Sequence, residues 1–308
     1  MRVNPGRADR VGALSDEKDS SSGPRKRSVS DQSKGAMGIV RNIKTLLNDP
    51  VVARDYLNYW GSRLKNSGAA VRSLPGGIKI TEFCNFSEFH SVGEFVSDEE
   101  REFLSTHPIG SGAIIDVGAN LGIVSFILAK RFPQRTIHAF EPVPSTFHAL
   151  TTNIEINACP NIRALQCAVA DQDGQVIFNA DPVGRAINSI AVSKGDFAIK
   201  VRCATLDTYA EENSIDQIAF LKVDVEGFEA AVFQGARRTL LKRAAALIYY
   251  EVCPVNSKNS GIDPELPTRL LIESGYKIHR ISQQGGLEAV GLSDVRQTVL
   301  DNWVAVRP

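Results

Sequence analysis

The chain has 308 residues, 43% of them apolar, and its 35 basic and 35 acidic side chains give a formal net charge of zero. This composition allows a sizeable core, in one large α/β domain with an extension or in two small domains. Zero net charge argues against binding to bulk nucleic acid or to an anionic membrane, and no apolar run approaches the roughly 20 residues that cross a bilayer. Five scattered cysteines without metal-ligand spacing indicate reduced thiols in a cytoplasmic protein.

The N-terminal part of the chain divides into a tail and an extension. Residues 1–36 are rich in Ser, Gly and charged side chains and almost free of large apolar ones, which predicts a disordered tail. Residues 37–111 form an N-terminal extension of helices and a strand. Helical apolar spacing runs over 38–64, residues 78–83 alternate as a half-buried strand does, and residues 97–100 (Ser-Asp-Glu-Glu) have the capping box of a helix start.

Residues 112–308 alternate between short apolar runs and helical patterns. The apolar runs lack polar alternation, so they predict strands buried on both faces. Strand–helix alternation of this kind is typical of βαβ units and therefore of a parallel sheet. The predicted strands span 113–117, 136–140, 162–169, 218–223, 246–252 and 276–281, and the predicted helices 121–132, 144–157, 228–241 and 264–274. Residues 176–178 and 201–203 predict added strands, and residues 302–306 predict an edge strand.

A glycine-rich turn follows the first of these strands, with the sequence Asp116-Val117-Gly118-Ala119-Asn120-Leu121-Gly122. Glycines let the backbone turn tightly and approach a ligand without a Cβ in the way. The dinucleotide fingerprint G-x-G-x-x-G differs, because Asn120 stands at its second glycine and Ile123 at its third. The second glycine lets a pyrophosphate come close, so this turn disfavours NAD or FAD and suits a ligand without phosphates. A tight turn without any ligand is the alternative.

An acidic residue ends the next strand, in Phe140-Glu141-Pro142. An acid at this place, about 20 residues after the turn, can accept hydrogen bonds from both hydroxyls of a ribose. Pro142 stops the strand and fixes the turn that follows. The alternative is an exposed carboxylate at a strand end. Together with the glycine turn, Glu141 predicts a nucleoside site at the carboxyl edge of the sheet.

A third motif gathers carboxylates after a buried strand. Asp224, Glu226 and Glu229 lie close in sequence and repel one another, so their grouping needs a reason. Glu229 suits the positive end of the helix that follows, whereas Asp224 and Glu226 are expected to face the same crevice as Glu141. Glu251 ends the next strand and is able to join them. A divalent metal held by Asp224, Glu226 and Glu251 is one alternative, and helix-terminus electrostatics alone is another.

These motifs resemble those of the FkbM family of methyltransferases. The resemblance runs from about residue 112 to the C-terminus and rests on Asp-Val-Gly-Ala-Asn, Phe-Glu-Pro, Thr-Leu-Asp at 205–207 and Lys-x-Asp-x-Glu-Gly at 222–227, together with Asn153. It implies an α/β, Rossmann-like class I methyltransferase fold, with a seven-stranded, mostly parallel sheet whose last strand is antiparallel. It implies S-adenosyl-L-methionine as the cofactor and methyl donor, and a hydroxyl of a sugar or polyketide-like small molecule as the acceptor.

The motifs and the resemblance together name candidate site residues. The candidates for cofactor binding are Asp116, Gly118, Ala119, Asn120, Gly122, Glu141 and Pro142. Asp224 and Glu226 are the candidate catalytic residues, as acceptors of the proton that an alcohol must lose. His138, inside the second strand, is expected to be a packed residue. No metal and no nucleic-acid partner are expected. An NAD(P)-dependent oxidoreductase and a catalytically inactive cofactor-binding module are the alternative functions.

Overall fold

The computed structural model describes residues 49–179, 189–190, 198–242 and 245–307. The chain divides into two units, Met1–Pro50 and Val51–Pro308, and nearly all described residues belong to the second. The predicted tail over 1–36 and the first part of the helical pattern over 38–64 lie outside the described residues.

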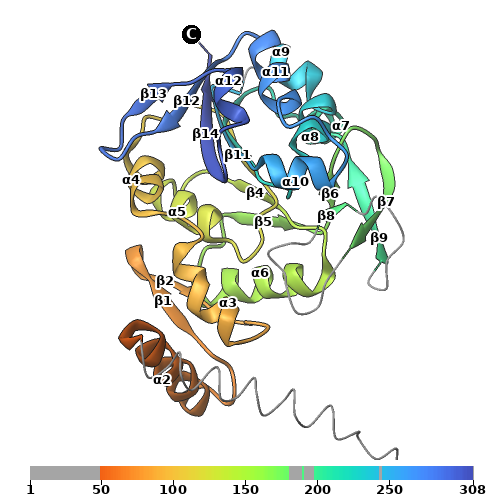
Figure 1. Cartoon of the computed structure of the whole chain (residues 1–308). Coiled ribbons are helices and arrows are strands. Elements are labelled where there is room, and N and C mark those ends of the chain that lie inside the picture. The colour runs from red at the N-terminus through yellow and green to blue at the C-terminus, as the bar shows by residue number, and fades with distance from the viewer. Residues whose placement is uncertain (1–48, 180–188, 191–197, 243–244, 308) are drawn as a thin grey trace, which may run out of the picture. The chain divides into compact units, whose positions relative to one another are not determined.

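A mostly parallel sheet of eight strands organises the larger unit (Figure 1). Six strands run in one direction, because β14 is antiparallel to both of its neighbours, β11 and β12, and β13 is antiparallel to β12. The α/β, Rossmann-like fold and the antiparallel last strand are therefore confirmed, but the expected number of seven is wrong because β13 adds an edge strand. In order across the sheet the strands are β13 (Leu287–Ala289), β12 (Lys277–Ile281), β14 (Asp301–Val306), β11 (Leu247–Val252), β10 (Ile218–Val223), β3 (Ala113–Val117), β4 (Ile137–Phe140) and β5 (Ile162–Leu165).

The last strand lies inside the sheet. The prediction of an edge strand at 302–306 is wrong, because β14 pairs along its whole length with β11 and also with β12 on its other side. Trp303 is 1% exposed and Val304 is fully buried. A short apolar strand has the same pattern at an edge and in the interior, so the sequence pattern did not separate the two positions.

Helices cover both faces of the sheet, and successive strand residues enter different apolar layers. Ile114 and Phe220 pack with the helices of one face, while their neighbours Ile115 and Leu221 pack with the helices of the other. Burial on both faces explains why the strands show no polar alternation. The first face carries α4 (Asp98–Thr106), α5 (Ile123–Arg131) and α6 (Pro144–Ile156), and the second carries α7 (Leu206–Glu212), α8 (Glu229–Gln234), α9 (Arg237–Lys242) and α11 (Leu266–Glu273).

The helix predicted over 228–241 is divided into α8 and α9. Gly235 ends α8, and a Cβ on it would lie 1.9 Å from the carbonyl oxygen of Ala170, so the chain passes too close for a side chain. The carboxylate of Asp207 then accepts a hydrogen bond from Thr239 N (2.6 Å) in the first turn of α9. A partner distant in sequence therefore begins the second helix, and the local pattern did not reveal it.

A second sheet of four strands follows β5 in the chain. The strand predicted over 162–169 divides, because β5 ends at Leu165 and the following strand pairs with β9 instead of the main sheet. The added strands predicted at 176–178 and 201–203 are confirmed, and both lie in this second sheet. Its order is β6 (Ala168–Val169), β9 (Ala198–Ala204), β7 (Gly174–Asn179) and β8 (Ser189–Ile190).

The described part of the N-terminal extension packs beside α5 and α6. A hairpin turns at Pro75–Gly77, where Gly76 has a φ of 75°. Its second strand begins at Ile78 as predicted but ends at Ile80 instead of residue 83, because its pairing with the three residues of β1 ends there. Asn153 of α6 accepts a hydrogen bond from Thr81 N (2.8 Å) after that strand, and donates one to Leu121 O (3.2 Å) in the glycine turn. The elements are α2 (Pro50–Lys65), β1 (Arg72–Leu74), β2 (Ile78–Ile80) and α3 (Phe86–Ser91).

The predicted helix start at Ser97 is confirmed, because Ser97 and Glu100 form a capping box at the beginning of α4. Among the described helices, none has the length and apolar character needed to cross a bilayer.

Candidate active site

Two connected cavities lie at the carboxyl ends of β3, β4, β10 and β11. They meet at Gly118, Asn120, Asp224 and Glu226, which line both. Open α/β sheets bind ligands at this edge, where the strand order reverses. The inner pocket, of about 70 Å³, is also lined by Val117, Phe140, Glu141, Pro142, Cys167, Ala168, Val169, Phe178 and Val225. The outer cavity, of about 770 Å³, extends to η2 (Val92–Glu94), α4, β11 and β14.

Gly118 is required by the close approach of two strand ends. Its φ is 77°, and a Cβ on it would lie 1.8 Å from the carbonyl oxygen of Asp224. Its backbone N–H and that of Ala119 donate to Phe140 O (3.0 and 2.8 Å), which fixes the turn against β4. Gly118 and Ala119 therefore line cavities, and their role in cofactor binding stays a prediction, but the glycine also serves the packing of β3 against β10.

Asn120 presents backbone and side chain to the junction of the cavities. Its φ is 51°, in the left-handed region, where Asn is one of the few side chains commonly found. Its backbone N–H donates to Glu141 Oε2 (3.1 Å), while its buried Oδ1 accepts no hydrogen bond within the described part of the chain. Gly122 lies differently: its φ is 96° and its Cβ would meet Leu150 and Phe126, so it serves packing at the start of α5 and lines neither cavity.

Asp116 lies behind the turn and is fully buried. Its Oδ2 accepts a hydrogen bond from Ser125 Oγ (2.6 Å), and its Oδ1 lies 3.4 Å from Lys222 Nζ. It lines neither cavity. This places Asp116 as a support of the turn through Lys222.

Lys222 links the two strand ends and is a residue that our sequence analysis missed. It is 4% exposed, donates to Gly118 O (2.6 Å) and lies 3.4 Å from carboxylate oxygens of both Asp116 and Asp224. Burial by itself would lower the pKa of Lys222, but the carboxylates of Asp224 and Asp116 outweigh it and raise the pKa. The available signal was a lysine inside a fully buried strand, which requires a charged partner.

Glu141 is buried at the end of β4, with 6% of its surface exposed. Its Oε2 accepts from Asn120 N (3.1 Å) and its Oε1 accepts from Val143 N (3.0 Å). Burial raises the pKa of Glu141 to about 7, although these two hydrogen bonds oppose the rise. The alternative of an exposed strand-end carboxylate is therefore wrong. A carboxylate has roughly four acceptor positions, so two remain for hydroxyl donors.

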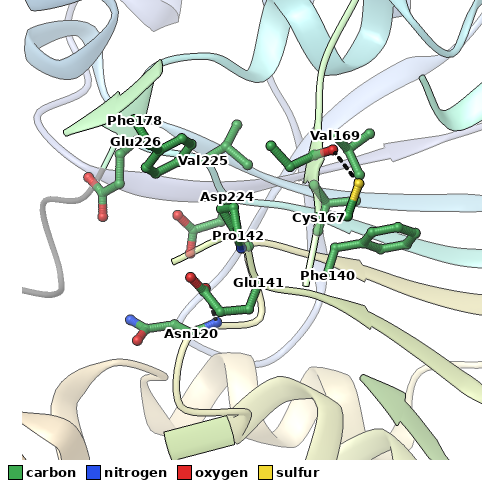
Figure 2. Close-up of a pocket in the computed structure, with 13 residues that line it drawn as sticks. Asn120, Phe140, Glu141, Pro142, Cys167, Val169, Phe178, Asp224, Val225 and Glu226 are labelled. Carbon is green, nitrogen blue, oxygen red and sulfur yellow. Dashed lines mark hydrogen bonds between the residues drawn. The ribbon is translucent and has the colours of Figure 1, made fainter. Parts of the chain in front are cut away.

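The inner pocket has a polar side and an apolar side (Figure 2). The side chains of Glu141, Asn120 and Asp224 lie together, and those of Cys167 and Val169 lie apart from them. Pro142 and the ring of Phe178 complete the lining. The sequence analysis did not find the apolar residues, because they come from the loop after β5 and from the second sheet.

Three carboxylates meet where the cavities join. Oxygens of Asp224, Glu226 and Glu251 lie within 4.8 Å of one another. Glu226 has a φ of 54° and accepts a hydrogen bond from Asn256 Nδ2 (2.8 Å) in α10 (Pro254–Asn259). Burial, with Asp224 and Glu229 nearby, raises the pKa of Glu226 to about 8. The group has the ligand types of a divalent-cation site, which was the alternative for this motif.

Of these three carboxylates, Glu251 has the fewest partners among the described residues. Its Oε2 is buried and has no hydrogen-bond partner among the described residues. Burial raises the pKa of Glu251, and the carboxylates of Asp224, Glu226 and Glu229 raise it further.

Glu229 fixes the loop that carries the two candidate catalytic residues. It is the first residue of α8, and its Oε1 accepts from Val225 N (3.1 Å) and Gly227 N (3.2 Å). A Cβ on Gly227 would lie 2.5 Å from the backbone of Asn256, so this turn packs tightly on α10. The predicted position of Glu229 at the helix start is confirmed.

A comparison with known protein families identifies the family of this chain. The family model of the methyltransferase FkbM domain matches residues 116–278, just over half of the chain. The chain belongs to the FkbM methyltransferase family. The matched segment runs from the glycine turn to β12 and includes Glu141, Asp224, Glu226 and Glu251.

Relatives in the FkbM family are distant. Methyltransferase sdnD of Sordaria araneosa is 28% identical over 198 residues, which are 54% of this chain and 74% of that protein. Hexuronic acid methyltransferase AglP of Haloferax volcanii is 28% identical over 159 residues, 52% of this chain and 61% of that protein. This chain spans between 57% and 74% of the length of the curated relatives it matches. A solved precorrin-6y C5,15-methyltransferase from Geobacter metallireducens is 11% identical, with a TM-score of 0.40, covering 69% of this chain and 89% of that one.

Two histidines of this FkbM-family chain, His138 and His90, lie away from both cavities. His138 is 9% exposed, and its Nδ1 lies 2.7 Å from the hydroxyl of Tyr209, which confirms a packed residue. His90 lies in α3, with its Nδ1 2.9 Å from the carboxylate of Asp55. Neither residue lines the inner pocket or the outer cavity.

Proposed function

We propose that this chain is an S-adenosyl-L-methionine-dependent methyltransferase that methylates a hydroxyl of a sugar or of a natural-product-like small molecule. One observation carries the proposal. The buried carboxylate of Glu141 and an apolar wall form a pocket that opens, past Gly118 and Asn120, into a cavity large enough for a second ligand. Cavities of several hundred Å³ hold small molecules, so the arrangement suits a nucleoside donor and a separate acceptor.

The residues of the inner pocket fit the cofactor. Glu141 would accept from the ribose hydroxyls, the side chains of Val169 and Phe178 would flank the base, and the turn at Gly118 and Asn120 would hold the amino-acid end. The buried, unpartnered Oδ1 of Asn120, judged against the described residues, is an acceptor that a ligand N–H or O–H would satisfy. When bound, S-adenosyl-L-methionine supplies an electrophilic methyl group.

Asp224 and Glu226 support a role on the acceptor side. Both line the junction of the two cavities, where the methyl group and the second substrate have to meet. Because burial brings the pKa of Glu226 to about 8, this carboxylate is suited to take the proton that a hydroxyl loses near neutral pH. Lys222 forms an ion pair with Asp224, so we propose it as a positioning residue for that carboxylate. Holding the acceptor oxygen in line with the methyl group would account for much of the rate.

The alternative functions fit the site less well. A dinucleotide requires close approach of a pyrophosphate to the turn, and there the side chain of Asn120 occupies the position of the second glycine. An inactive module would have no use for the carboxylates retained at the junction. Five free cysteine thiols support a reducing compartment, and we propose the cytoplasm.

Calorimetric titration with S-adenosylmethionine, S-adenosylhomocysteine and NAD tests the proposal. Both adenosyl ligands should bind, and S-adenosylhomocysteine should raise the melting temperature by mass action, while NAD should do neither. If NAD alone stabilises the protein, or no adenosyl ligand binds at millimolar concentration, the proposal fails.

A further inference from the structure

The outer cavity is acidic well beyond the cofactor pocket. Five carboxylates line it without lining the inner pocket, and they come from distant parts of the chain: Glu94, Glu99, Glu100, Glu251 and Asp301. Among the described residues that line the cavity, Lys222 is the only cation. This charge distribution contrasts with the zero net charge of the whole chain.

Lys222 is not free to bind an acidic acceptor. Its Nζ donates to Gly118 O and lies 3.4 Å from the carboxylates of both Asp116 and Asp224. Its ammonium charge is therefore already compensated by two carboxylates of the protein. Among the described lining residues, an anionic acceptor would therefore meet carboxylates and no uncompensated cation.

Two of the five carboxylates accept hydrogen bonds from side chains of the protein. Glu100 Oε1 accepts from the hydroxyl of Tyr249 (2.6 Å) and from Asn302 Nδ2 (2.7 Å). Asp301 Oδ2 accepts from Trp303 Nε1 (3.0 Å). Glu100 thereby joins α4 to β11 and β14, while the Asp301 contact stays within β14.

The other three carboxylates have unused capacity. Glu94 is exposed and Glu99 half-buried, and neither makes a hydrogen bond or ion pair with the part of the chain that the structure describes. Glu251 Oε2 is buried and likewise lacks a hydrogen-bond partner there. A buried carboxylate without a partner is costly, and a cationic ligand group would remove that cost.

We propose that the acceptor carries a positive charge beside its hydroxyls, as an amino sugar does, and that the outer cavity rejects acidic acceptors. The ammonium group occupies the acidic outer cavity, which Glu251, Glu94 and Glu99 line, while a hydroxyl faces the junction. This inference deepens the proposed methyl transfer and rests on it. It also separates this chain from the Haloferax volcanii relative, whose name gives a hexuronic acid as its substrate.

The test compares three sugars of one shape and different charge. D-glucosamine, D-glucose and D-glucuronate are titrated into the full-length protein saturated with S-adenosylhomocysteine, at low salt and with metals removed by a chelator. Glucosamine should bind about tenfold or more tightly than glucuronate, with glucose between them, because opposing like charges in a cavity costs several kcal/mol. The preference should weaken at high salt.

Matched variants locate the effect in the cavity. Glu94→Gln with Glu99→Gln removes two free carboxylates outside the catalytic machinery and should reduce the preference several-fold. Glu155→Gln with Glu273→Gln changes the net charge equally at exposed positions outside both cavities and should leave it unchanged. Equal effects of the two pairs would overturn the proposal.

Several results of the sugar titrations would contradict the proposal. Equal affinity for the three sugars, a preference for glucuronate, or no binding of glucosamine would overturn the proposal. Loss of the preference on addition of Mg²⁺ would assign the carboxylates to a metal and would also overturn it. Failure of the proposed function is visible separately, because S-adenosylhomocysteine would then not bind at all.

Discussion

Replacing Lys222 by Met removes the buried ammonium group that links β3 to β10. Methionine keeps the length and apolar stem of lysine but removes the ammonium group that contacts Asp116, Asp224 and Gly118 O. Asp116 is fully buried, so its carboxylate would lose its cation without gaining access to water. Removing one partner of a buried ion pair costs about 3–5 kcal/mol of unfolding free energy, because an uncompensated charge remains.

Thermal and denaturant unfolding at neutral pH measures this loss. For a unit of this size, 3–5 kcal/mol corresponds to a fall in melting temperature of roughly 6–20 °C. Lys130→Met is the matched control: Lys130 is exposed and donates only to the carbonyls of Gly76 and Gly77, so its loss should cost less than about 1 kcal/mol.

The contribution of Lys222 to stability should depend on pH in one direction. Because the folded-state pKa of Lys222 is raised, its contribution to stability is complete below the ordinary lysine pKa of about 10.4 and is lost only above it. Between about pH 5 and 9 the difference between wild type and Lys222→Met should therefore be large. A variant within 1 kcal/mol of wild type at neutral pH would refute this reasoning.

Three further predictions concern the turn, the ribose acceptor and the junction. Gly118→Ala should cost at least about 3 kcal/mol of unfolding free energy, because Gly118 has a positive φ and a Cβ there would lie 1.8 Å from another atom. Gly261→Ala is the control and should cost about 1–2 kcal/mol, because Gly261 has a positive φ but no atom within 4 Å of the added Cβ. Equal losses of unfolding free energy would contradict the role of packing at Gly118. Glu141→Ala should weaken S-adenosylhomocysteine binding by roughly 1.5–3 kcal/mol in calorimetry. Because the pKa of Glu141 is raised to about 7 and the ionised form is the better acceptor, wild-type affinity should fall as the pH drops through 7, and the variant should lack this fall. Asp224→Asn or Glu226→Gln should lower turnover by about 10²–10⁴ with little change in cofactor affinity; affinity that collapses together with turnover would move both residues to the cofactor site.

Local sequence patterns were sufficient for most strands of the main sheet and for the polar residues of the inner pocket. The apolar strands, the glycine turn and the acid after β4 are all expressed in runs of a few residues, so they could be read without knowing their neighbours. Glu141 illustrates this, because its place at a strand end, about 20 residues after the turn, already indicated a ribose acceptor. Its burial and its hydrogen bonds to Asn120 and Val143 came only from the structure.

Strand position and partnership had to come from the tertiary structure. The sequence of β14 is that of any short apolar strand, and only its insertion between β11 and β12 makes it an interior strand. The division of the helix at Gly235 depends on the backbone of Ala170, which lies close in space and far in sequence. Such contacts leave no periodic trace in either segment.

The candidate site shows the same division. The sequence by itself determined that Asp224 and Glu226 follow a buried strand and share an edge with Glu141, because the carboxyl ends of parallel strands lie along one edge. It did not determine what faces them. Glu94 comes from the extension and Asp301 from the last strand, and only the folded chain brings them to one cavity with these acids, because their spacing in sequence bears no relation to their distance in space.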